Sequence, residues 1–132
     1  MGIEENEVQS RIIKYINSSE IKRDFPEIEF SCCHRVNNKG IRGRKSTLEC
    51  GFPDLVGSIT LGGIAICLFV EVKARRKDCK NPEQLKFLAE KQQMGAIAFW
   101  CNSLADFKTK FLEQFIQCRY RLASNKVVMG FE

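Results

Sequence analysis

Hydrophobic residues recur along the chain with two different periods, and the period separates helices from strands. Residues 4–17 carry aliphatic residues at helical spacing, namely Val8, Ile12, Ile13 and Ile16. The opening turns of this segment hold three acids, Glu4, Glu5 and Glu7. Since negative charge is favourable near a helix N-terminus, both features predict a first helix over residues 4–17.

Beyond Pro26 the pattern changes to alternation. Three apolar residues are separated by single polar ones: Ile28, Phe30 and Cys32. This spacing predicts a strand that runs toward His34 and Arg35. The neighbouring Cys32 and Cys33 do not suggest a metal site, because adjacent residues of a strand point to opposite faces.

A predicted antiparallel hairpin occupies the middle of the chain. The β-prone runs over residues 53–60 and 65–73 flank Gly62-Gly63, and two such residues are typical of a tight hairpin turn. The second run is apolar almost throughout, as expected for a central strand covered on both faces. Glu71 interrupts this run and is therefore conspicuous.

Capping signals predict two further helices. Asn81 precedes a proline and Gln84 follows at the third helical position, so a helix should begin there and end at Gly95. Residues 96–101 then form a buried strand. The capping box over residues 103–106 opens a last helix, whose expected inner face consists of Leu104, Phe107, Phe111, Leu112, Phe115 and Ile116. Residues 126–131 suggest a short edge strand.

The element order is therefore α-β-β-β-α-β-α, an α/β fold with a mixed β-sheet flanked by helices. With 132 residues, 44% of them hydrophobic, residues 1–132 can form one domain with its own core. The longest apolar stretch, Ile64–Val70, is too short to span a membrane, and the acidic start does not suit a secretory signal. We therefore expect an intracellular protein with no membrane partner. The seven cysteines contain no Cys-x-x-Cys pair, which favours reduced thiols.

Basic residues gather in two segments, although the net charge of +5 is modest. The first holds no acid and five bases: Arg35, Lys39, Arg42, Arg44 and Lys45. The second, residues 73–80, holds five bases against one acid: Lys73, Arg75, Arg76, Lys77 and Lys80. Either segment alone is explained by a solvated loop. Together they favour a polyanionic partner, of which nucleic acid is the commonest.

Two carboxylates should meet at one end of the predicted hairpin. Asp54 lies as far before the Gly62-Gly63 turn as Glu71 lies after it, so the two residues should sit opposite each other. Carboxylates this close repel unless a cation lies between them. Oxygen ligands suit Mg²⁺ or Mn²⁺ better than zinc, and the sequence indicates no organic cofactor.

Lys73 should share a face with Glu71, because side chains of a strand alternate with a period of two. A cation beside a metal ion would hold a water and offset charge on a phosphate, as phosphodiester hydrolysis requires. On spacing alone, a simple ion pair on a solvated face explains the same residues equally well.

These motifs resemble those of a known family. Gly51-Phe52-Pro53-Asp54 followed by Glu71-Val72-Lys73 is similar to the signature of the PD-(D/E)XK nucleases. Three further segments resemble the VRR-NUC branch of that superfamily. They are Arg35-Val36-Asn37-Asn38-Lys39-Gly40, Pro82-Glu83-Gln84-Leu85-Lys86-Phe87 and the strand at residues 95–99. The resemblance covers roughly residues 4–107, and several ordered motifs are more specific than a lone Glu-x-Lys.

The resemblance implies a restriction-endonuclease-like core and roles for individual residues. Asp54, Glu71 and the Val72 carbonyl would bind the metal ion, and Lys73 would position water or stabilise charge. Glu7 matches a position where an acid completes the metal site, although a surface glutamate that complements the helix dipole is the alternative. Gln84 matches a catalytic glutamine of the family, although a capping contact with the Asn81 amide explains it equally well.

The implied activity is hydrolysis of DNA phosphodiester bonds with Mg²⁺ or Mn²⁺. Backbone phosphates would meet the basic residues Arg35, Lys39, Arg42, Arg44, Lys45, Arg75 and Arg76, whereas Trp100 belongs in the core. Some members of the family cut flaps or four-way junctions, often as homodimers, and both features stay open for this chain. The alternatives are a non-catalytic DNA-binding module on the same fold and, more remotely, a metal-independent structural subunit.

Overall fold

The computed structural model describes residues 3–36, 51–74 and 81–128 of the chain. These residues form a mixed α/β fold with a four-stranded sheet flanked by helices, which confirms the predicted class. In chain order the elements are α1 (Ile3–Asn17), α2 (Ser19–Asp24), β1 (Phe30–Arg35), β2 (Leu55–Leu61), β3 (Ile64–Val72), α3 (Pro82–Gln93), β4 (Ile97–Cys101) and α4 (Leu104–Val128).

The sheet has the strand order β1-β2-β3-β4, in which β1, β2 and β3 are antiparallel and β4 runs parallel to β3. The predicted turn between β2 and β3 is confirmed, because Gly62 and Gly63 both have positive φ angles, 56° and 79°. Leu55 pairs with Val70 in this hairpin. Continued by one residue, this register would place Asp54 opposite Glu71, and the Asp54 carboxylate accepts from the N–H of the neighbouring Val72.

Helices cover the two faces of the sheet unequally. The larger core lies between the sheet and the helices α1 and α4, and its largest fully buried side chains are Tyr15, Phe107 and Phe111. A smaller cluster lies on the opposite face, where Phe87 and Leu88 of α3 pack near Phe69 and Trp100. Burial of these apolar side chains drives the assembly of both layers.

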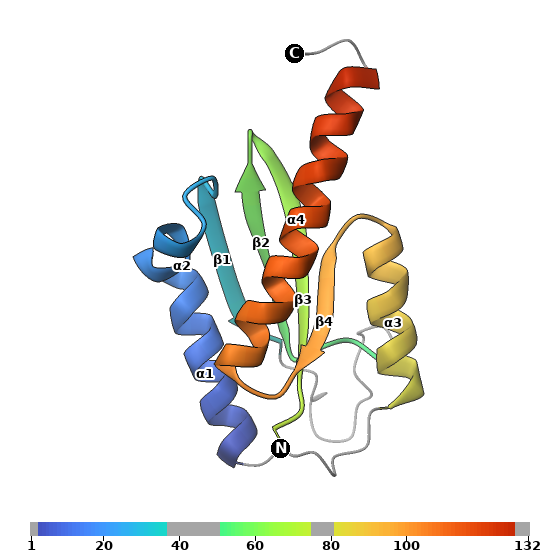
Figure 1. The fold of residues 1–132 in the computed structure, drawn as a ribbon. Coiled ribbons are helices and arrows are strands. Elements are labelled where there is room, and N and C mark those ends of the chain that lie inside the picture. The colour runs from blue at the N-terminus through green and yellow to red at the C-terminus, as the bar shows by residue number, and fades with distance from the viewer. Residues whose placement is uncertain (1–2, 37–50, 75–80, 129–132) are drawn as a thin grey trace.

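One end of the sheet brings together the parts of the chain that carry the candidate site. Figure 1 shows the C-terminal ends of β3 and β4 at the same end of the molecule as the N-termini of α1, α3 and α4. The N-terminus of a helix carries partial positive charge and unpaired N–H groups. That end of the fold therefore favours negatively charged groups.

Side-chain amides close both edges of the sheet. The carboxamide of Asn17 accepts from the Cys33 N–H at 2.9 Å and donates to the Cys33 carbonyl at 2.8 Å, at the β1 edge. On β4, Gln114 makes the same pair of bonds to Ala98, at 2.8 Å and 2.9 Å. An open strand edge is a template for pairing with another chain. Strand addition at Cys33 or Ala98 would first have to displace these amides.

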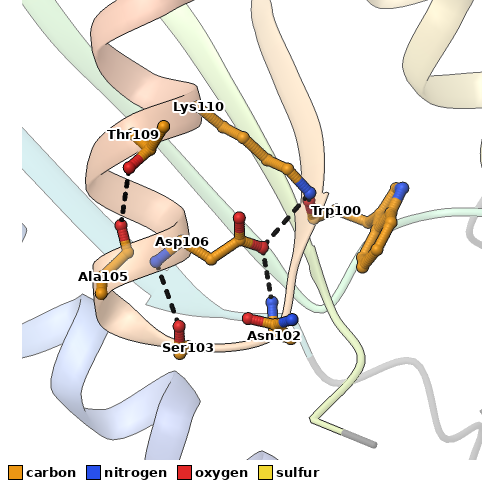
Figure 2. Close-up of polar contacts among 7 residues, drawn as sticks. All are labelled: Trp100, Asn102, Ser103, Ala105, Asp106, Thr109 and Lys110. Atoms are coloured by element: carbon orange, nitrogen blue, oxygen red, sulfur yellow. Dashed lines mark hydrogen bonds and ion pairs between the residues drawn. The ribbon is translucent and has the colours of Figure 1, made fainter. Parts of the chain in front are cut away.

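The start of α4 is held by a polar cluster (Figure 2). Ser103 Oγ accepts from the Asp106 N–H at 3.0 Å, which confirms the predicted cap, and Asp106 accepts from the Asn102 N–H. Lys110 lies 3.2 Å from the Asp106 carboxylate and donates to the Trp100 carbonyl at 2.7 Å. These contacts fix the C-terminal end of β4 against α4.

Several details differ from the sequence predictions. The short helix α2 was not predicted; it begins where Ser18 Oγ accepts from the Glu20 N–H, and it buries Ile21. In β1 the buried residue is Cys33, whereas Phe30 is 70% exposed and Cys32 is exposed. Ile28 is buried but precedes β1. The apolar alternation of Ile28, Phe30 and Cys32 therefore covers both the strand and the segment before it.

The last helix and the central strand were also predicted imperfectly. Phe107, Phe111 and Phe115 face the core as expected, but Leu112 and Ile116 are each 46% exposed, because residues one position beyond a helical stripe turn away from it. The first half of β3 is exposed on one face of the sheet, because α3 covers only the part of β3 that pairs with β4. Residues 126–128 are helical, not an edge strand, and residues 129–131 lie outside the described residues.

Candidate active site

Asp54 is fixed at the start of β2 by its backbone and by its side chain. Its carbonyl accepts from the Val36 N–H at 2.9 Å, which extends the pairing of β1 with β2. Its carboxylate oxygen Oδ2 accepts from the Val72 N–H at 3.0 Å. The side chain therefore leans across to the end of β3, next to Glu71.

Glu71 is a buried acid beside another acid. The residue is 3% exposed, and its Oε2 atom has no hydrogen-bond partner among the described residues. Burial raises the pKa of Glu71 far above its ordinary value, and a hydrogen bond with Asp54 and the charge of that residue raise it further. When both groups are ionised, neither can donate a hydrogen bond. Close approach of the two carboxyl groups is therefore favoured when one of them is protonated or when a cation lies nearby.

Lys73 lies on the same face as Glu71, as the sequence predicts. Its Nζ atom is 3.8 Å from Glu71 Oε1, and the lysine side chain is 20% exposed. The positive charge opposes the upward shift of the Glu71 pKa without cancelling it. At this distance the contact is an ion pair rather than a hydrogen bond.

The Val72 backbone belongs to the same cluster, while its side chain is fully buried in the larger core. The N–H and C=O groups of one strand residue point to the same side of the strand. Since the Val72 N–H points at Asp54, the Val72 carbonyl also faces the β2 side of β3.

Gln84 lies in the first turn of α3, which begins beside the turn that precedes β2. A Cβ atom at Gly51 would lie 2.5 Å from the Glu83 carbonyl oxygen, so only glycine allows the two segments to pack this closely. Asn81 caps α3 by accepting from the Glu83 N–H at 2.8 Å. The buried Oε1 atom of Gln84 has no hydrogen-bond partner among the described residues. Its Oε1 therefore makes no contact with the Asn81 amide, which was the capping alternative.

Two acids of α1 bear on the predicted site, namely Glu7, which the family position suggested, and Glu5, which the sequence analysis did not single out. The side chain of Glu7 is exposed, whereas the charge of Glu5 raises the pKa of Glu71. Glu5 lies four residues before Gln9, and both share a helical stripe with the buried Ile12. The helical period in the sequence contained this signal, but the sequence prediction relied on the family position of Glu7.

Only one residue of the predicted phosphate-binding set falls in the described part of the chain. Arg35 is exposed at the end of β1, and it donates three hydrogen bonds to α1. The other predicted contacts lie outside the described residues: Lys39, Arg42, Arg44, Lys45, Arg75 and Arg76.

The cysteines of the described ranges are free thiols. Cys32 is exposed and Cys33 is buried, so the two adjacent side chains point to opposite faces as expected. No group of three or more His, Cys, Asp or Glu side chains in residues 3–36, 51–74 and 81–128 is arranged to hold a metal ion. No helix of those residues is long and apolar enough to cross a bilayer.

Neither a protein-family model, nor a curated protein, nor a solved structure matches the chain. The chemistry of the site must therefore be argued from its own residues.

Proposed function

We propose that the chain is a metal-dependent nuclease with a restriction-endonuclease-like core of the PD-(D/E)XK kind, acting on DNA. One observation carries the proposal: Glu71 is buried against Asp54, and its Oε2 atom has no donor among the described residues. A buried acid that has an unsatisfied oxygen and lies beside a second acid is costly unless it serves a purpose. Binding a divalent cation is the simplest such purpose.

The donor atoms suit Mg²⁺ or Mn²⁺. Both ions prefer oxygen ligands, and Mg²⁺ commonly retains several waters while one or two carboxylates and the substrate phosphates complete its shell. Asp54, Glu71 and the Val72 carbonyl would hold the ion, and a site of two carboxylates requires no third acidic side chain. When bound, such an ion acts as a Lewis acid toward a phosphate and activates water for attack.

The remaining residues have distinct tasks in this proposal. Lys73 would stabilise negative charge on the phosphate or orient the attacking water, since its ammonium lies on the face of Glu71. The unsatisfied Oε1 atom of Gln84 would accept a hydrogen bond from water or contact the ion.

The element order also supports the proposal. A hairpin carrying Asp54 and Glu71 is followed by a helix and a parallel strand, an arrangement that the resemblance implies for these nucleases. The N-termini of α1, α3 and α4 at the same end of the sheet favour a phosphate there (Figure 1). DNA is the proposed substrate because of the basic segments on either side of the hairpin in the sequence.

The decisive experiment compares metal-dependent cleavage in matched variants. Purified protein would be incubated with linear, circular, flapped and four-way DNA, with and without Mn²⁺ or Mg²⁺. We expect cleavage only with metal, and its loss in Asp54→Asn and Glu71→Gln. Glu113→Gln, which neutralises an exposed acid of α4, is the control and should cleave normally. DNA binding without cleavage under every condition would instead identify a non-catalytic DNA-binding module.

A further inference from the structure

A groove lies beside the first half of β3, at the end of the sheet remote from the acid pair. Strand β4 pairs with β3 only from Leu68 onward, so residues 64–67 extend beyond it. Figure 1 shows the β2–β3 hairpin and α4 both continuing past the start of β4. The groove has a volume of about 410 Å³, within the range of about 300–1,000 Å³ typical of ligand sites. Its walls are residues 64–67 of β3, the turn at residues 93–95 and the α4 residues Cys118, Arg121 and Leu122.

The backbone of β3 presents hydrogen-bonding groups to this groove. The N–H and C=O groups of one strand residue point to the same side, and that side alternates along the strand. The Lys73 N–H donates to the Cys101 carbonyl of β4, so the odd-numbered residues of β3 direct these groups toward the β4 side. Ala65 is one of them, and it lies three residues before the first pair with β4. In the described part of the chain, no strand lies beside the Ala65 N–H and C=O groups.

This part of β3 differs from the two outer edges of the sheet. At the β1 edge, the amide of Asn17 bonds to the Cys33 backbone. At the β4 edge, the amide of Gln114 bonds to the Ala98 backbone. Among the described residues, no side chain covers the Ala65 backbone in this way. An open strand edge is a template for an added strand, in which main-chain hydrogen bonds give affinity and side-chain pockets give specificity.

The side chains of the groove indicate which segment would complement it. Leu122 and the Cys118 side chain supply apolar surface from α4. Arg121 is the one charged side chain among the described residues that line the groove. Its Nη2 atom donates to Cys118 Sγ at 3.3 Å, and the guanidinium has further donors for a carboxylate. A segment that carries an acidic side chain between apolar ones therefore matches the groove in charge and polarity.

We propose that the groove beside residues 64–67 binds an extended acidic segment of a partner protein, which adds to the sheet as a strand next to β3. A second copy of this chain fits less well, because its own β3 edge is recessed between α4 and the turn at residues 93–95. Extended strand separates Ala65 from Glu71 by about 20 Å. A bound segment would thus leave the acid pair open, and the inference does not depend on the proposed nuclease function.

The probe is a displayed library of random peptides, selected on the immobilised full chain without metal. We expect the enriched peptides to alternate apolar and polar residues and to contain an acidic side chain. Enriched peptides would then be synthesised with blocked ends and methylated at one backbone nitrogen at a time. Methylation should abolish binding at every second position and be tolerated between them, because only alternate residues of an added strand direct their N–H toward β3. Tolerance at every position would overturn strand addition.

Two variants of the chain test the groove itself. Ala65→Pro removes the backbone donor and leaves the pairing with β2, since proline is tolerated where a strand N–H faces an open edge. It should weaken peptide binding by about tenfold, because the peptide carbonyl loses its partner, whereas Ala65→Val keeps the N–H and should bind like the parent. Arg121→Gln should also weaken binding by about tenfold. Arg11→Gln, at an exposed arginine of α1, is its control.

Hydrogen exchange locates the binding site without reference to activity. The Ala65 amide should exchange more slowly when peptide is bound, and melting curves check that each variant is folded. If Ala65→Pro unfolds, the methylated peptides and Arg121→Gln still decide the question. Failure to enrich any peptide, or parent-like binding in both Ala65→Pro and Arg121→Gln, would overturn the proposal. Self-association of the parent that Ala65→Pro abolishes would identify a second copy as the occupant instead. Absence of DNA cleavage in the parent would overturn the proposed function alone.

Discussion

Asp54 accepts the backbone amide of Val72 through its carboxylate oxygen Oδ2, at 3.0 Å. Val72 lies between Glu71 and Lys73 in the sequence, so this single bond holds the Asp54 side chain against the residues that carry the proposed chemistry. The bond also occupies a backbone donor at the end of β3 that no further strand pairs. The position of the Asp54 side chain is therefore set in part by the backbone of the hairpin.

The raised pKa of Glu71 predicts how the metal-free protein responds to pH. An acid with a higher pKa in the folded than in the unfolded chain contributes stability that is complete below the unfolded pKa of about 4.3. That contribution is lost as the pH rises toward the folded pKa. We therefore expect the Tm without metal to fall between about pH 5 and about pH 8.

Glu71→Gln should remove this slope, because glutamine is neutral across the range. At pH 8 the variant should unfold at a higher temperature than the parent, and about 1 kcal/mol corresponds to about 4 °C for a domain of this size. Burial raises the pKa of the Cys33 and Cys101 thiols to about 12, so they do not titrate in this window. Thermal melts in chelator would check the result, and a Glu71→Gln curve parallel to that of the parent would refute it.

A second prediction separates turnover from metal binding at Lys73. The ammonium is a cation beside the site and cannot be a ligand, so Lys73→Ala should bind Mn²⁺ at least as tightly as the parent. Cleavage at saturating Mn²⁺ should fall by about 100-fold, the usual cost of losing one charge-stabilising donor. Calorimetric titration and single-turnover rates measure the two quantities. Lys14→Ala, on the exposed side of α1, is the control, and loss of Mn²⁺ binding in Lys73→Ala would contradict the role.

The sequence predicted the parts of the fold that depend on local signals. The positive φ angles that Gly62 and Gly63 adopt in the turn are the conformation that glycine permits, so the hairpin register, which brings Asp54 close to the end of β3, followed from counting residues. The Asn81 and Ser103 caps likewise fixed the starts of α3 and α4. Each of these features is determined within a few residues of the chain.

Features that depend on distant packing were not predictable in the same way. Phe30 is exposed because no helix covers that face of β1, and the local alternation of apolar residues carries no information about that. Arg35 contacts α1, about 25 residues earlier in the chain, and nothing in the local sequence around Arg35 indicates these contacts. The unsatisfied Gln84 oxygen depends on how α3 packs against Gly51, which only the tertiary structure reveals.

The basic residues of the segment 35–45 give a third prediction, although Arg42 and Arg44 lie outside the described residues. If both side chains contact phosphates, DNA affinity should fall steeply with salt for any sequence. Replacing both by alanine should then reduce the slope of log K against log salt by about 2, because each phosphate contact contributes about 0.9. Binding isotherms at several salt concentrations measure the slope. The double variant Arg11→Ala and Arg23→Ala is the matched control. An unchanged slope in the variant without Arg42 and Arg44 would mean that these two side chains do not contact phosphates.

The last prediction concerns how much Gln84 lowers the stability of the metal-free protein. A buried acceptor without a partner destabilises a fold by about 1–3 kcal/mol. Methionine has nearly the volume of glutamine and no strong acceptor, so it should fill the same space without that cost. We therefore expect Gln84→Met to raise the Tm in chelator by a few degrees, while cleavage at saturating Mn²⁺ decreases.

A gain in stability together with a loss of activity is the pattern expected of a residue retained for function. Gln93→Met is the control, because Gln93 is exposed at the end of the same helix and should alter neither quantity. Melting curves in chelator and cleavage rates across a Mn²⁺ titration distinguish the outcomes. Lower stability in Gln84→Met would mean that its amide has a partner in the folded protein. Raised stability with unaltered cleavage would mean that Gln84 has no role in the site. The ion would then be bound by Asp54, Glu71 and the Val72 carbonyl alone.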